Sequence, residues 1–234
     1  MRAVQIGLCV ATTACAASLA HAAVTFTGTG NNPEVNALAS GSATFTITGN
    51  TLTIELTNTT SPRTASQGNA LTGVSFDLDG GSPILAFTSI TMTAGSELWT
   101  SKTSHTAVAN INGSWTNVLG ASPLGEYGAA STGFGGRFHG GSITLGNSGP
   151  NYGVVAAGTF DGTNGVSFGG SQFPFIQDSV TLTFTGIAGF TESQIENVKI
   201  LFGTDGTGVV TTVPAPGAAV LAGIGGLVAF RRRR

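Results

Sequence analysis

One short motif in the chain has the residue types of a nucleophile site. Residues 165–169 read Gly-Val-Ser-Phe-Gly and match the G-x-S-x-G turn that exposes the serine of α/β-hydrolases. That turn needs a strand before it, a helix after it and a histidine later in the chain. No helical periodicity follows Ser167, and the last histidine, His139, precedes it. We interpret the match as coincidence in a Gly- and Ser-rich stretch and predict that the protein is not an enzyme.

Metal chemistry has few ligands to draw on. His105 and His139 lack an H-x-x-x-H or H-E-x-x-H spacing, and both cysteines, Cys9 and Cys15, lie in the N-terminal segment. Acidic turns are the remaining candidates, since Ca²⁺ binds carboxylate and carbonyl oxygens. Their aspartates are Asp77, Asp79, Asp161 and Asp205. Asp-Gly is also ordinary turn chemistry, and no loop has the full EF-hand ligand series. We therefore expect no metal and no cofactor, with these four as the weak Ca²⁺ candidates.

Aromatic side chains could stack on sugar rings if they formed an exposed platform. The candidates are Trp99, Trp115, Tyr127 and Tyr152. Packing in the core or under loops is the alternative, because large aromatic rings contribute strongly to cores. The acidic residues are scattered without a motif, so no pair of carboxylates for glycoside hydrolysis can be identified.

The charge of the chain restricts its partners. Charged residues make up 9% of the sequence, against about 25% in typical domains. Between residues 23 and 212, four basic residues stand against eleven acidic ones. A net acidic body argues against nucleic acid, whose phosphates need a basic surface. Cations or neutral polymers, such as an extracellular polysaccharide, are compatible partners.

Residues 1–22 have the three parts of a secretory signal peptide. Arg2 precedes an apolar stretch over residues 6–17, and small residues follow at the −3 and −1 positions. The cleavage region is formed by Ala20, Ala22 and Ala23. We predict that signal peptidase cuts after Ala22 and that the protein is exported. The alternative is a lipoprotein signal with Cys15 as the lipidated residue.

Residues 213–234 show a second three-part pattern. A Pro-containing segment is followed by an apolar run over residues 218–230 and by a basic cluster. The segment is Val213, Pro214, Ala215, Pro216 and Gly217, and the cluster is Arg231, Arg232, Arg233 and Arg234. At about 1.5 Å per residue, a helix from Gly217 to Phe230 spans roughly 21 Å, which is short for a stable membrane span. The arginines should stay cytoplasmic and leave the body outside. An ordinary tail anchor is the alternative.

The body, residues 23–212, is predicted to be one all-β domain. Apolar and Thr residues alternate with period 2, which is typical of half-buried strands. The expected strands are residues 43–48, 52–56, 74–78, 84–92, 180–185 and 198–202, with a capping-box turn at 191–194. Residues 120–170 hold sixteen of the 36 glycines and are expected to form loops, with short strands near 142–145 and 152–156. We predict a single β-sandwich of jelly-roll type with a Gly-rich loop region.

The C-terminal pattern resembles the PEP-CTERM sorting signal, the tail that exosortases process. The resemblance covers residues 213–234 and departs at Ala215, where the signal usually has Glu. It implies that a membrane protease of the exosortase type cuts near Pro214–Pro216. It also implies transient anchoring in the inner membrane and delivery to the cell surface, the outer envelope or the extracellular matrix.

The body is similar to a family of uncharacterised exosortase-dependent surface proteins. Short blocks carry this resemblance: residues 49–54, 56–59, 71–77, 131–135, 151–153 and 178–180. The family has no established catalytic residues to transfer. Our leading hypothesis is a surface or matrix protein with a structural or interaction role and no catalysis. The alternatives are a glycan-binding module, which exposed aromatics lining a groove would favour, and a hydrolase, which converging catalytic groups would favour.

Overall fold

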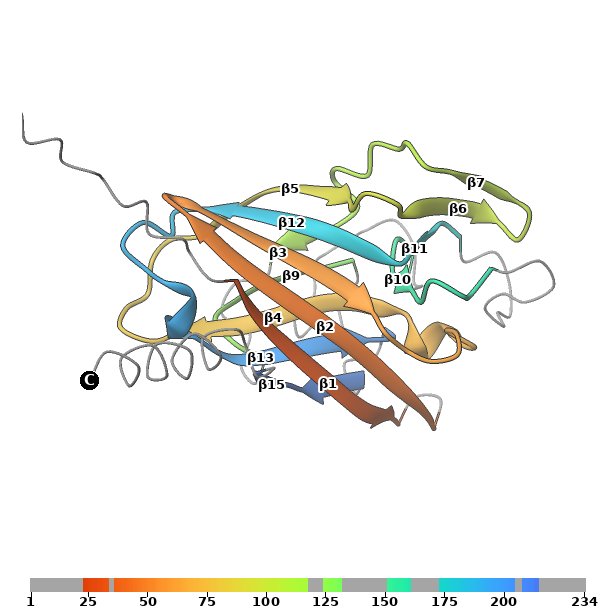
Figure 1. Ribbon diagram of the computed structural model, residues 1–234, viewed down its shortest axis with the longest axis horizontal. Coiled ribbons are helices and arrows are strands. Elements are labelled where there is room, and N and C mark those ends of the chain that lie inside the picture. Colours follow the sequence, from red (N-terminus) through yellow and green to blue (C-terminus); the bar gives the residue numbers. More distant parts are fainter. Residues whose placement is uncertain are drawn as a thin grey trace, which may run out of the picture.

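The computed structural model describes residues 23–33, 36–117, 124–131, 151–160, 173–204 and 208–214. More than half of these residues lie in β-strands, and two sheets lie one in front of the other as a curled sandwich (Figure 1). The expected all-β class is therefore confirmed. Residues 1–22 and 215–234, with the predicted signal peptide and apolar run, lie outside the described ranges. Within those ranges no helix is long and apolar enough to cross a membrane.

The first sheet has six antiparallel strands in the order β15-β1-β2-β3-β12-β5. Their bounds are Val213–Pro214, Val24–Asn32, Ala37–Thr48, Thr51–Asn58, Ser179–Thr185 and Ala86–Met92. The predicted hairpin between β2 and β3 turns at Gly49, whose φ of +61° favours glycine. β1, β2 and β3 follow one another both along the chain and in the sheet, so three long strands from the N-terminal part of the body make up much of this sheet.

The second sheet has the order β14-β13-β4-β10-β11-β6-β7, with β9 paired to β4 and β8 paired to β9. In that order the bounds are Gly208–Thr211, Ile195–Phe202, Leu71–Leu78, Val154–Val155, Phe175–Gln177, Glu97–Ser101, Ser104–Thr106, then Tyr127–Ala130 for β9 and Thr116–Asn117 for β8. Two short 3₁₀ turns, η1 (Gln67–Asn69) and η4 (Glu192–Gln194), complete the described elements.

The strands predicted from alternation are all present, and the capping-box turn is confirmed at η4. There the Gln194 side-chain oxygen accepts from the Thr191 N–H at 2.9 Å. The short strand expected near residue 154 is β10, whereas the one expected at 142–145 lies outside the described residues. The alternation did not reveal β1, because Gly28 and Gly30 stand at the inward positions where apolar side chains give the signal.

A row of phenylalanines joins the two sheets through the core. Phe45 of β2 meets Phe76 of β4 with ring centroids 5.3 Å apart, and Phe76 meets Phe184 of β12 at 6.2 Å. These edge-to-face contacts are typical of aromatic cores, and each fully buried Phe contributes about 1.5–3 kcal/mol. A second, smaller cluster contains Ala70, Trp99, Val155, Phe160 and Phe175. The body holds its core without a disulfide, since both cysteines lie in residues 1–22.

A buried asparagine also ties the sheets together. Asn58, at the end of β3, is only 2% exposed. Its side-chain amide donates to the carbonyls of Asn69 and Val154 at 2.9 and 2.8 Å, and its oxygen accepts from the Thr60 N–H at 3.0 Å. Val154 belongs to the second sheet. One side chain therefore satisfies three buried backbone groups from three segments of the chain.

Candidate functional site

The aromatic residues considered for sugar stacking are turned inward. Trp115 and Tyr127 are 2% and 8% exposed, and Tyr152 is half-buried against the main core. The Trp115 indole N–H donates to the Tyr152 carbonyl at 3.0 Å, and the Tyr127 hydroxyl donates to the Pro83 carbonyl at 2.8 Å. These polar atoms are satisfied by the protein itself. The core-packing interpretation therefore holds for these rings, and they form no outward platform.

Trp99 is the centre of a stack of rings under the β6–β7 hairpin. The His105 ring centroid lies 4.3 Å and the Phe160 ring centroid 4.5 Å from the Trp99 ring centroid, and both rings are nearly parallel to the indole. His105 Nδ1 lies 3.1 Å from a Glu97 carboxylate oxygen. The Trp99 indole N–H is buried with no hydrogen-bond partner. His105 of β7 thus covers the Trp99 ring, and at 8% exposed Trp99 has little surface left for a sugar.

The Asp77 carboxylate is committed to hydrogen bonds within the protein. One of its oxygens accepts from the Glu126 N–H at 2.7 Å, and the other accepts from the Asn197 amide at 2.9 Å. Burial raises the pKa of the nearby Tyr127 hydroxyl above its usual value, and the negative charges of Glu126 and Asp77 raise it further, against a hydrogen bond with Ser82 that lowers it. The two hydrogen bonds of Asp77 connect β4 to β13 and to Glu126, the residue directly before β9.

Of the other metal candidates, the structure describes Asp79. Asp79 lies in the turn after β4, where its carbonyl accepts from the Gln194 amide at 2.9 Å. Within the described ranges no group of three His, Cys, Asp or Glu side chains could hold a metal ion. Asp161, Asp205, His139 and Ser167 lie outside those ranges.

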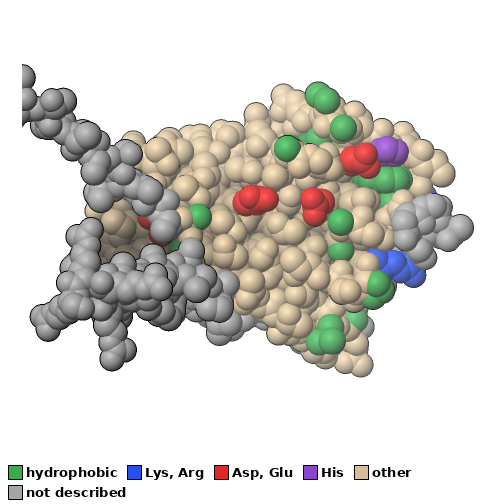
Figure 2. All heavy atoms as spheres, viewed as in Figure 1, with side chains coloured by type: hydrophobic (Ala, Val, Ile, Leu, Met, Phe, Trp, Pro, Cys, Tyr) green, Lys and Arg blue, Asp and Glu red, His purple; other side chains and the backbone are tan. Residues whose placement is uncertain are grey.

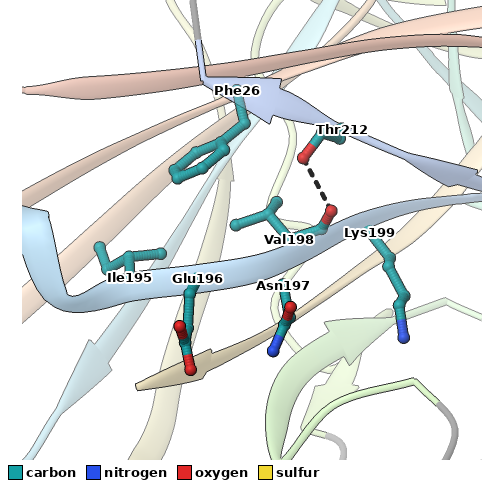
Figure 3. A pocket seen from close by; sticks show the side chains of 7 residues that line it. All are labelled: Phe26, Ile195, Glu196, Asn197, Val198, Lys199 and Thr212. Atoms are coloured by element: carbon teal, nitrogen blue, oxygen red, sulfur yellow. Dashed lines mark hydrogen bonds between the residues drawn. The ribbon is translucent and has the colours of Figure 1, made fainter. Parts of the chain in front are cut away.

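A recess of about 250 Å³ opens at one edge of the sandwich, between β1 and β13 (Figure 3). Phe26, Ile195 and Val198 point toward one another across it, whereas Glu196, Asn197 and Lys199 extend from the opposite side of β13. A bulge in the pairing of β13 with β4, centred on Asn197 at φ +50°, re-aims these side chains. The recess offers apolar contact, and its described side chains present no converging catalytic groups.

The end of the body crosses this open edge from one sheet to the other. β14 pairs with β13 of the second sheet, and β15 then pairs with β1 of the first. Between them the Thr212 hydroxyl donates to the Val198 carbonyl at 2.7 Å (Figure 3). β15 contains Val213 and Pro214, in register with Thr27 and Phe26. The sheet thus extends two residues past the boundary expected at residue 212.

The remaining sorting and cleavage residues lie mostly outside the described ranges. Of the predicted tail motif, Ala215, Pro216 and Gly217 are outside, as are Arg231, Arg232, Arg233 and Arg234. Ala20 and Ala22 are also outside, whereas Ala23 is exposed and directly precedes β1.

The outer side of the first sheet carries a large array of Ser and Thr side chains. We call it the hydroxyl face, and it consists of Thr25, Thr27, Thr29, Ser40, Ser42, Thr44, Thr46, Thr48, Thr51, Thr53, Thr57, Thr181, Thr183, Thr185, Ser89 and Thr91. Each alternates with an inward neighbour, so all point away from the core. The space-filling view shows this side as mostly uncharged, with acidic side chains near its middle and Lys or Arg only at its right-hand rim (Figure 2).

The sheet register aligns these hydroxyls into rows across the strands. One row runs Thr46, Thr53, Thr183 and Ser89 over β2, β3, β12 and β5. The next row runs Thr25, Thr44, Glu55, Thr181 and Thr91 and covers five strands. The sequence showed the alternation within single strands, but only the pairing of β3 with β12 shows that the rows are continuous.

No known family model, curated protein or solved structure matches the chain. The site is therefore defined by the geometry of this chain alone.

Proposed function

We propose that this chain is an exported surface or extracellular-matrix protein with a structural or interaction role and no catalysis. In this proposal signal peptidase removes residues 1–22, and an exosortase-like membrane protease processes the tail at residues 213–234. The observation that carries the proposal is the order of the C-terminal segments: Pro-Ala-Pro, a short apolar run and four arginines. In this proposal the tail holds the protein for a time in the inner membrane, with its body on the outer side, before it reaches the cell surface.

The way the body ends supports this proposal. β15 covers the outer edge of β1 up to Pro214, and a proline on an edge strand has no N–H to offer to a further strand. A cut at residues 215–217 would leave both sheets with all their described strands. The residues after such a cut can thus be removed without removing a described strand.

We further propose that the sandwich is of jelly-roll type, with a membrane helix at residues 218–230 in the unprocessed form. Repeated crossings between the two sheets, as from β3 to β4, β4 to β5 and β11 to β12, support this topology.

Substitutions in the tail test the sorting proposal. Pro214→Ala with Pro216→Ala should block processing and leave the full-tail form in the inner-membrane fraction. Replacing Arg231 to Arg234 with Ser should weaken retention, because charge no longer opposes passage of the C-terminus through the bilayer. A matched control is Lys102→Ser, which removes an exposed charge from the β6–β7 turn. If both tail variants reach the surface in the same processed form as the wild type, the sorting proposal is wrong.

A further inference from the structure

The hydroxyl face has the geometry of a regular array. Neighbouring strands in a sheet are about 4.8 Å apart, and alternate residues along a strand are about 6.7 Å apart. The aligned rows over β2, β3, β12 and β5 place hydroxyls at those two spacings. Each hydroxyl offers one donor and two acceptor lone pairs. The face therefore presents many equivalent hydrogen-bonding groups at repeated intervals.

The array is nearly free of charge. In the five strands that form it, all of them described, Glu55 is the one charged residue. Other acidic groups, including Asp77 and Glu196, belong to strands of the second sheet. These five strands carry no basic residue, so a polyanion finds no complementary charge here, and Glu55 is the one carboxylate in them that a cation could meet. The face is thus suited to a neutral partner.

The hydroxyls are also held in place before any partner arrives. Thr is β-branched, so its side chain has few rotamers to lose on binding. Some hydroxyls brace one another: Thr25 with Thr44 at 2.9 Å, and Thr29 with Ser40 at 2.9 Å. Strands β1, β2, β3 and β12 are paired on both sides, which keeps their backbones rigid. Such preorganisation lowers the entropic cost of binding.

We infer that the hydroxyl face binds a neutral polysaccharide. A polymer of sugar units repeats hydroxyl groups along its length, and these can exchange hydrogen bonds with the rows of Thr and Ser. The sugar C–H faces can rest on the Thr methyl groups between the hydroxyls. Single contacts of this kind are weak, since a neutral hydrogen bond contributes about 0.5–1.5 kcal/mol net. Their number along the rows supplies the affinity, as in other multivalent contacts.

Three substitutions in the best-aligned row test this inference. Thr46→Val, Thr53→Val and Thr183→Val remove three adjacent hydroxyls and keep a β-branched shape. The matched control is Thr100→Val, Thr103→Val and Thr106→Val, which removes hydroxyls from the β6–β7 hairpin of the other sheet. The full chain, purified in mild non-ionic detergent, is mixed with insoluble cellulose and sedimented, and its mobility is measured in gels containing dextran or alginate.

We expect the wild type to bind at least one neutral glucan and to keep binding at 1 M salt, where charge contacts are screened within about 3 Å. The row variant should bind about tenfold more weakly or worse, and the control variant should match the wild type. The inference is wrong if the protein binds neither neutral glucan, if the row variant binds as well as the wild type, or if alginate is preferred. It is also wrong if the row variant differs from the wild type only in losing self-association of the protein. Circular dichroism and melting of both variants establish that they fold.

Discussion

Replacing Asn58 with Ala should cost the body a large part of its stability. The side chain makes three hydrogen bonds between 2.8 and 3.0 Å to backbone groups, two of them to carbonyls of Asn69 and Val154. Asn58 is 2% exposed, so water cannot readily take its place. With about 1–1.5 kcal/mol for each lost bond, the substitution should lower the free energy of unfolding by about 3–5 kcal/mol. Total stabilities of domains are about 5–15 kcal/mol, so the effect is severe.

Urea unfolding followed by circular dichroism measures this loss through the shift in midpoint at constant slope. Asn58→Asp keeps the acceptor for the Thr60 N–H and loses both donors, so it should also be strongly destabilising. Asn31→Ala is the matched control, because Asn31 is an exposed β1 residue that donates only to the Asn36 side chain at 3.0 Å. It should change stability by less than about 0.5 kcal/mol. A loss below about 1 kcal/mol for Asn58→Ala would refute the idea that this side chain joins the sheets.

Three further predictions follow from other contacts. Burial raises the pKa of Tyr127, so above pH ~10 the unfolded chain loses the phenol proton while the folded chain keeps it. Stability should therefore fall as pH rises from about 9 to about 11. In Tyr127→Phe the urea midpoints at pH 9 and pH 11 should differ less than they do in the wild type. Thr212→Val should cost about 1 kcal/mol by removing the 2.7 Å bond to Val198, whereas Thr103→Val, exposed in a turn, should cost almost nothing in the same unfolding assay. Deleting Gly208–Pro214 exposes the edges of β13 and β1, so light scattering should show aggregation that a chain ending at Gly217 does not show.

The sequence predicted those parts of the fold that local periodicity encodes. Strands β2, β3 and β12 alternate apolar and polar residues, and their apolar side is buried as that alternation predicts. In β4 the polar residues Thr72 and Ser75 are buried as well, which alternation does not predict. The local pattern places Val213 and Pro214 in the tail, because proline and a following apolar run dominate it. Their strand partner, β1, lies at the other end of the chain. Local sequence carries no information about such a pairing.

The candidate surface was predictable in composition and unpredictable in extent. Alternating Thr residues indicate an outward polar face on each strand. The continuous rows depend on the register between β3 and β12, where Thr53 pairs with Thr183. Similarly, Asn58 reads as an ordinary polar residue at a strand end, and its partner Val154 lies 96 residues away. The inward orientation of Trp115 and Tyr127 also required the packed sheets.

The intact mass of the protein extracted from the cell surface is the most direct test of export and tail processing. We predict an N-terminus at Ala23 and a C-terminus within residues 215–217, so that β15 is retained and the apolar run and arginines are lost. A lipidated Cys15 would contradict the predicted signal cleavage. An intact Arg234 terminus on the surface protein would show that the tail is a plain anchor, and the account of sorting by an exosortase-like protease would fail.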